Sequence, residues 1–218
     1  MKATKSEMRS YIFYHLDGIA LIPTILCLGK QNMLNEFSEK KISLSYLTKK
    51  YNANEGYLNV ALRLLCCQGW LTQSFDNGDV FFVKNKSIHL QKIYNTYQIT
   101  ESFFLNTINY NNIFKSSKKI EEKKLFEIIK KYLTTRDAIL NSINTSLNLE
   151  KHIEGFILAP ILVFLARKNL LNKKCFQNLE MQKDWKELLI NLFSTLQIIK
   201  KNNTSSSLTS FGDFIFKR

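Results

Sequence analysis

One short pattern that could carry acid–base chemistry occurs twice in this 218-residue sequence. An imidazole beside a carboxylate can move protons or bind a metal ion, so two copies that faced each other could form such a site. One copy on a single helix could not, because residues two positions apart point in nearly opposite directions. The pattern is His-x-(Asp or Glu)-Gly, and its residues are His15, Asp17 and Gly18, then His152, Glu154 and Gly155.

The repeat extends well beyond this pattern. Residues 15–23 read HLDGIALIP and residues 152–160 read HIEGFILAP, and the same spacing separates Asn32 from Asn169. A constant spacing over this length indicates two copies of one structural unit rather than an array of short repeats. We therefore expect the histidines and carboxylates to orient helices or to border a pocket, ahead of the alternative that they serve a stand-alone enzyme.

The elements that must position these residues begin with a helix predicted over residues 8–35. Its apolar side chains recur at helical spacing, and Pro23 inside it predicts a kink or a break because proline has no N–H to donate. The apolar run 19–28 is too short to span a bilayer, and although it follows a basic start, no small-x-small cleavage site follows it. We expect a core helix of a cytoplasmic protein, with no membrane as partner.

Two short helices and a hairpin should follow, in the order of a winged helix-turn-helix unit. Ser43 and Asn54 are placed to cap the two helices, and Gly69 to end the second. Two β-prone runs flank Asn77 and Gly78, which predicts a hairpin because a type I′ turn needs a positive φ at both central residues. The expected ranges are 44–51 and 55–68 for the helices and 70–75 and 80–83 for the strands.

The second copy is expected to be a degraded version of the same unit, with a helix over 184–200 and a wing strand over 208–216. Between the copies we expect helical connectors, most clearly at 121–133. The sequence therefore predicts a mainly α protein with small β-wings. Its expected parts are a winged-helix-like unit at 8–86, a helical connector at 87–150 and a degenerate winged-helix-like unit at 151–218.

Motifs of complete enzyme domains are absent from the sequence. The seven glycines form no dinucleotide- or triphosphate-binding loop, and neither GxSxG nor HExxH occurs. The four cysteines have no metal-ligand spacing, and three of them lie in apolar helical patterns, so we expect buried thiols in a reducing compartment. No catalytic residue, metal site or cofactor site is expected.

The formal net charge of +13 is typical of proteins that bind nucleic acids. The excess is mostly lysine, scattered along the chain among abundant Asn and Ile, so we interpret it as compositional. A winged helix would place the helix at 55–68 in the major groove, but few polar side chains face outward there and the wing tip is acidic. DNA binding remains the alternative, with Lys49, Lys50 and Arg63 as contacts.

The stretch Tyr57-Leu58-x3-Leu62-Arg63-Leu64-Leu65-x3-Gly69-Trp70-Leu71 resembles the winged-helix signature at the N-terminus of many S-adenosylmethionine-dependent methyltransferases. Asp17-Gly18 followed by Pro23, and Leu208-Thr209-x2-Gly212, are similar to flanking features there. The two-copy arrangement is most similar to the N-terminal helical lid of C-methyltransferase-type domains in bacterial polyketide pathways, over residues 10–83 and 150–216.

This resemblance implies a module that dimerises or covers an acyl-type substrate, while a following Rossmann-like domain holds the cofactor. No residue here matches a cofactor-binding motif of that family, so we expect no cofactor on this chain, and S-adenosylmethionine only if a catalytic domain follows. The expected partner is a second copy or a methyltransferase domain. The residues proposed for a substrate or partner surface are Phe13, Tyr14, His15, Asp17, Phe103, Phe104, Tyr110, His152, Glu154 and Trp185.

Overall fold

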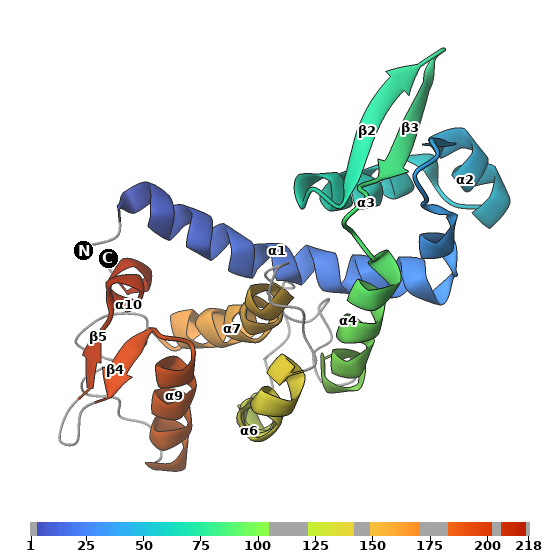
Figure 1. Cartoon of the computed structure of the whole chain (residues 1–218). Coiled ribbons are helices and arrows are strands. Elements are labelled where there is room, and N and C mark those ends of the chain that lie inside the picture. Colours follow the sequence, from blue (N-terminus) through green and yellow to red (C-terminus); the bar gives the residue numbers. More distant parts are fainter. Residues whose placement is uncertain (1–3, 105–121, 142–148, 171–182, 202–205, 217–218) are drawn as a thin grey trace. The chain divides into compact units, whose positions relative to one another are not determined.

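The computed structural model describes residues 4–104, 122–141, 149–170, 183–201 and 206–216 (Figure 1). By its internal contacts the chain divides into two compact units. Unit 1 comprises Met1–Ile19 and Thr100–Arg218, and unit 2 comprises Ala20–Ile99.

The first helix, α1 (Lys5–Lys30), contributes its first part to unit 1 and its second part to unit 2. Of the two outcomes predicted at Pro23, a kink or a break, the break is wrong, because the helix continues through this residue. The apolar side chains around it explain why: Ile22 and Ile25 are fully buried. Burial of that face offsets the hydrogen bond that proline cannot donate.

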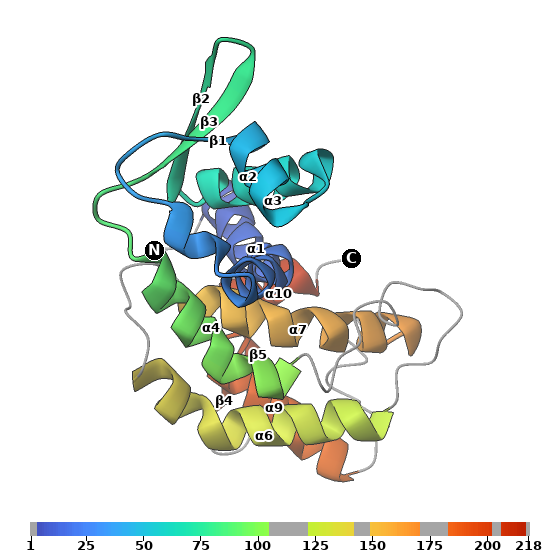
Figure 2. The ribbon, with the colours of Figure 1, turned by 90° about the vertical axis from the view of Figure 1, so that its right-hand side faces the viewer.

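Unit 2 has the element order of a winged helix. Its three strands form one antiparallel sheet in the order β1-β3-β2, and Figure 2 shows the hairpin of β2 and β3 extending beyond α2 and α3. After α1 the elements are the 3-10 helix η1 (Met33–Glu36), β1 (Ile42–Ser43), α2 (Leu44–Tyr51), α3 (Glu55–Cys67), β2 (Leu71–Asp76), β3 (Asp79–Lys84) and α4 (Leu90–Phe104), which runs past the boundary of the unit.

The predicted helix caps of unit 2 are confirmed. The Ser43 hydroxyl accepts a hydrogen bond from the backbone N–H of Tyr46 at 3.1 Å, and the Asn54 side-chain oxygen accepts one from Tyr57 at 3.1 Å. Each cap satisfies one of the N–H groups that a helix leaves unpaired in its first turn.

The predicted hairpin is also confirmed. Asn77 and Gly78 have φ of 48° and 80°, as a type I′ turn requires, and Gly69 has φ of 69° just after α3. The sequence did not predict β1, which pairs with β3 through Ile42 opposite Phe82. A two-residue strand is too short to show an alternating pattern.

Unit 1 is built from helices and a second small sheet. Helix α6 packs against both α7 and α9, while β4 contacts α9 and β5 contacts α10. The two strands pair antiparallel, with Ile199 opposite Leu208. Besides the first part of α1, the elements are α6 (Glu122–Asn141), α7 (Leu149–Arg167), α9 (Lys183–Thr195), β4 (Ile199–Lys201), β5 (Ser206–Leu208) and α10 (Ser210–Ile215).

Two predictions for the second copy are wrong. The helix expected over 184–200 ends at Thr195, and β4 follows it. The strand expected over 208–216 ends at Leu208, because the Thr209 side chain accepts a hydrogen bond from Gly212 and so caps a short helix. The aromatic residues of this segment suited a strand by propensity, and a local cap overrode that preference.

The prediction of a mainly α protein with small β-wings is confirmed. Among the described residues one helix, Ser6–Lys30, is long and apolar enough to cross a membrane by length and composition, as the core helix of a folded protein can be. The expectation of buried thiols is wrong at Cys27 and Cys67, which are exposed, while Cys66 is half-buried and Cys175 lies outside the described residues.

Candidate functional site

The two copies of the His-x-acid-Gly pattern meet inside unit 1, where α1 crosses α7. A Cβ atom added to Gly18 would lie 2.0 Å from the carbonyl oxygen of His152, and one added to Gly155 would lie 1.8 Å from that of His15. Real Cβ atoms do not approach so closely, so the two glycines allow the helix backbones to touch. Each copy makes the same contact with the other.

His15 connects the copies through its side chain as well. Its Nδ1 lies 2.7 Å from the Tyr11 carbonyl oxygen, and its Nε2 lies 3.5 Å from Oε2 of Glu154. A carbonyl oxygen can only accept, so Nδ1 carries a proton and donates it there. The side chains of His15 and Glu154 are 3% and 2% exposed, which places the pair out of reach of solvent.

Glu154 is also held by two cations from two helices. Lys151 Nζ lies 2.9 Å from Oε2, and Arg136 Nη2 of α6 lies 3.5 Å from Oε1. Burial raises the pKa of Glu154, but the interaction with the nearby His15 and the charge of Lys151 outweigh it, and the pKa lies below its ordinary value. Glu154 is therefore an ionised carboxylate in the protein interior.

His152, the counterpart of His15, is completely buried. Burial, and then the nearby charge of His15, lower the pKa of His152 to about 4, so this imidazole is neutral at pH 7. Asp17, the counterpart of Glu154, is half-buried on α1. The copies thus share backbone geometry and differ in the burial of their acidic residues.

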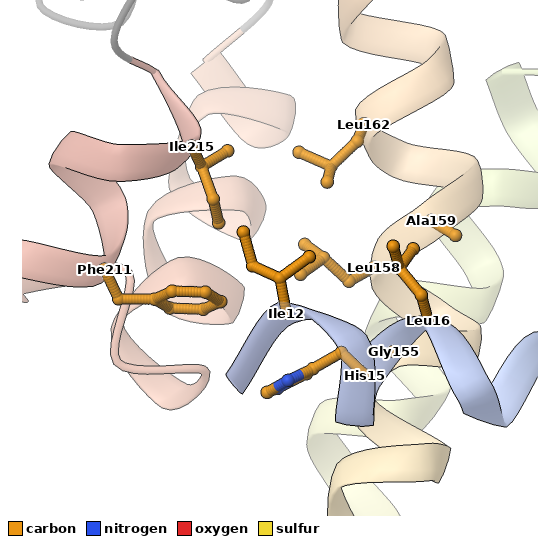
Figure 3. Close-up of a pocket in the computed structure, with 9 residues that line it drawn as sticks. All are labelled: Ile12, His15, Leu16, Gly155, Leu158, Ala159, Leu162, Phe211 and Ile215. Carbon is orange, nitrogen blue, oxygen red and sulfur yellow. The ribbon is translucent and has the colours of Figure 1, made fainter. Parts of the chain in front are cut away.

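A small apolar cavity of about 50 Å³ lies beside the crossing (Figure 3). It has room for about one or two water molecules. His15 is the one residue with a polar side chain in its lining, and the His15 ring lies 5.5 Å from that of Phe211. The cavity is lined by Ile12, His15 and Leu16 of α1, by Gly155, Leu158, Ala159 and Leu162 of α7, and by Phe211 and Ile215 of α10.

This arrangement supports a structural role better than a chemical one. An acid–base pair needs access to a substrate, and the cavity beside His15 is too small to admit one. Among the described residues, no three His, Cys, Asp or Glu side chains are grouped as metal ligands. The polar groups instead join three helices, with His15 on α1, Glu154 on α7 and Arg136 on α6.

The remaining residues expected at a substrate or partner surface lie in different environments. Phe13 and Tyr14 are 62% and 44% exposed on α1. Trp185 is buried, with its ring 5.4 Å from that of Phe164. Phe103 and Phe104 belong to α4 but their side chains lie outside the described residues, as does Tyr110 altogether.

The residues expected to contact DNA belong to unit 2. Lys50 donates to Glu36 at 2.7 Å and to the Tyr46 hydroxyl at 3.2 Å, and its hydrogen bond to Glu36 raises the pKa of this lysine. Its charge is therefore balanced within the protein. Lys49 and Arg63 are exposed.

Sequence reasoning missed the cations that balance Glu154. Lys151 could have been found, since it precedes Glu154 by three positions and lies on the same helix face. Arg136 gives no such signal, because it belongs to another helix and only the folded structure brings it near.

Comparison with known families supports a relationship at both ends of the chain. Residues 8–73 match the family model described as the AprA N-terminal domain, and residues 154–218 match the AprA winged helix domain. The first match contains one copy of the pattern, and the second begins at Glu154 within the other copy. No curated protein matches the chain.

Proposed function

We propose that this chain is a non-catalytic module of a methyltransferase-type system, which covers an acyl-type substrate or holds the catalytic domain in place. The two AprA family matches support a module of this kind, since one of them is a winged helix domain. The assignment to a methyltransferase system rests on the resemblance of residues 57–71 to the winged-helix signature of those enzymes.

The observation that carries the proposal is the burial of the group of described residues best suited to acid–base chemistry. His15, His152 and Glu154 are 2%, 0% and 1% exposed, and His15 and Glu154 join α1 to α7. Because these side chains are buried, we infer that they stabilise the helix crossing. Chemistry on a substrate would then be carried out by a partner domain.

Exposed aromatic side chains supply the surface that such a partner would cover. In unit 1, Phe13 and Tyr14 follow one another on α1, with Leu16 43% exposed two positions on. Large apolar residues grouped on a surface mark interaction sites, and aromatic residues contribute most to the affinity of interfaces.

The proposal is tested by binding to the S-adenosylmethionine-dependent methyltransferase domain encoded beside or downstream of this chain in its own genome. We expect association, and we expect the Phe13→Ser/Tyr14→Ser variant to bind at least about tenfold more weakly. Tyr46→Ser is the matched control, because Tyr46 is 48% exposed on α2 and should leave the affinity unchanged. The proposal would be wrong if the chain did not bind this domain, or if Tyr46→Ser weakened the binding as much as Phe13→Ser/Tyr14→Ser does.

DNA binding is the second candidate, supported by the winged-helix order of unit 2 and the exposed Arg63 on α3. The balanced charge of Lys50 and the acidic wing tip weigh against it. Titration with duplex DNA should show weak binding that physiological salt abolishes. Tight binding that survives this salt and is lost on reversing the charges of Lys49 and Lys50 would favour a regulator.

A further inference from the structure

Unit 2 contains a cleft of about 420 Å³, a size typical of sites that hold small molecules. It lies among α1, η1, the turn after α2, and α3. Its lining consists of Pro23, Thr24, Cys27, Leu28, Gln31, Met33, Tyr51, Ala53, Asn54, Tyr57, Leu58 and Ala61.

The lining contains no charged side chain, although 22% of the chain is charged. A charged ligand group would find no opposite charge here and would lose its hydration, which is costly. We therefore expect the part of a ligand that enters the cleft to be uncharged.

Three polar side chains of the lining are already hydrogen-bonded within the protein. The Thr24 hydroxyl donates to the Ala20 carbonyl oxygen at 2.7 Å, and the Tyr51 hydroxyl donates to Glu36 at 2.8 Å. The side-chain oxygen of Asn54 caps α3. These groups can line the cleft without a ligand partner, so its interior suits a hydrocarbon better than a hydrogen-bonding molecule.

The cleft opens to solvent beside two of its lining residues. Tyr57 is 81% exposed, so most of its ring is available to cover an apolar chain. Cys27 is exposed and also lines the cleft, so its thiol reports directly on whether the cleft is filled.

We propose that this cleft binds the hydrocarbon chain of a small molecule, such as an alkyl or acyl group, with any polar end left in solvent. The site belongs to unit 2 alone and does not depend on the proposed methyltransferase partner. The cavity beside His15 is too small for such a chain, and the larger hollow of about 1030 Å³ beside β4 and β5 is lined partly by Glu7 and Lys200.

The test is protection of Cys27 from iodoacetamide by octanol, measured on the full chain by peptide mass spectrometry. At about ten times the dissociation constant the cleft is empty in about one molecule in eleven, so alkylation of Cys27 should slow about tenfold. Cys67 is the internal control, because it is exposed on α3 and does not line the cleft. An octane diol with a hydroxyl at each end should protect less, since one hydroxyl must be buried.

Two variants keep the test decisive. Ala61→Phe should fill the cleft and weaken octanol binding at least about tenfold, whereas Val60→Phe, at a neighbouring position 59% exposed outside it, should not. If Ala61→Phe fails to fold, Tyr57→Ser alters only the exposed rim and should still weaken binding. An alkylation rate of Cys27 that octanol leaves unchanged, equal protection of Cys67, or equal binding by Ala61→Phe and wild type would overturn the proposal.

Discussion

The two copies of the His-x-acid-Gly pattern make the same backbone contact and yet differ at their histidines. Gly18 and Gly155 each lie against the other copy's histidine carbonyl. His15, however, faces a carboxylate at 3.5 Å, whereas burial lowers the pKa of His152 to about 4 and keeps it neutral.

The carboxylates differ in the same way. Glu154 is enclosed and balanced by cations from α6 and α7, whereas Asp17 is half-buried on α1. Glycines that permit close contact are therefore the feature that both copies share, whereas their acidic residues differ in burial. This difference indicates that the pattern serves to pack the two helices together. Variants of the glycines and of the acidic residues can separate the contribution of the shared backbone contact from that of the differing side chains.

The largest effect should come from the shared glycines. Gly18→Ala and Gly155→Ala each push a methyl group into a backbone carbonyl, and we expect each to cost about 3 kcal/mol of unfolding free energy. Gly56→Ala is the control, because its nearest neighbour lies 3.4 Å from the added Cβ; it should be neutral or stabilise α3 by up to about 1 kcal/mol. Urea denaturation measures all three. If all three variants had the same free energy of unfolding, the backbone contact would be refuted.

The charges should give a smaller and unequal effect. Glu154→Gln leaves Lys151 and Arg136 without their buried partner, but these side chains are 24% and 23% exposed and can turn to water. We therefore expect a loss of about 2 kcal/mol, below the usual cost of breaking a fully buried pair. Asp17→Asn should cost less than about 1 kcal/mol. If urea denaturation showed equal destabilisation of the two variants, the burial of Glu154 would make no difference to the crossing.

The last expected effect concerns pH. The folded pKa of His152 is about 4, below its ordinary value of 6.5, so its neutral form stabilises unit 1 above pH 6.5 and this contribution is lost as the pH falls towards 4. The lowered pKa of Glu154 acts in the same direction at lower pH. Between pH 7 and 5 we expect a loss of about 1 to 2 kcal/mol.

Thermal unfolding at a series of pH values measures this loss. His152→Gln should flatten the dependence between pH 7 and 5, whereas His89→Gln, at an exposed histidine, should leave it as in the wild type. A dependence that His152→Gln does not change would show that another group titrates.

The parts of the fold that sequence predicted are those set by local chemistry. Ser43 and Asn54 cap helices, and Asn77-Gly78 turns a hairpin, through interactions within a few residues. The segment after Leu208 was predicted wrongly because its aromatic residues suit a strand as well as a helix, and the Thr209 cap decided between them.

The candidate site was predictable only in outline. The repeated pattern indicated two copies of one unit without showing how they pack, and the structure brings them together where α1 crosses α7. The pairing of His15 with Glu154 rather than with its own neighbour, and the approach of Arg136 from α6, depend on tertiary packing that no local spacing reveals.

The most direct test of the proposed non-catalytic role is methyl transfer from S-adenosylmethionine, measured with the proposed methyltransferase partner domain. The chain is supplied either as wild type or as a His15→Gln/His152→Gln variant shown to be folded by circular dichroism. The proposed role predicts no methyl transfer by the chain alone, and the same kcat with either form. Methyl transfer by the chain alone, or a kcat about 100-fold lower with the folded double variant, would instead assign the histidines to catalysis.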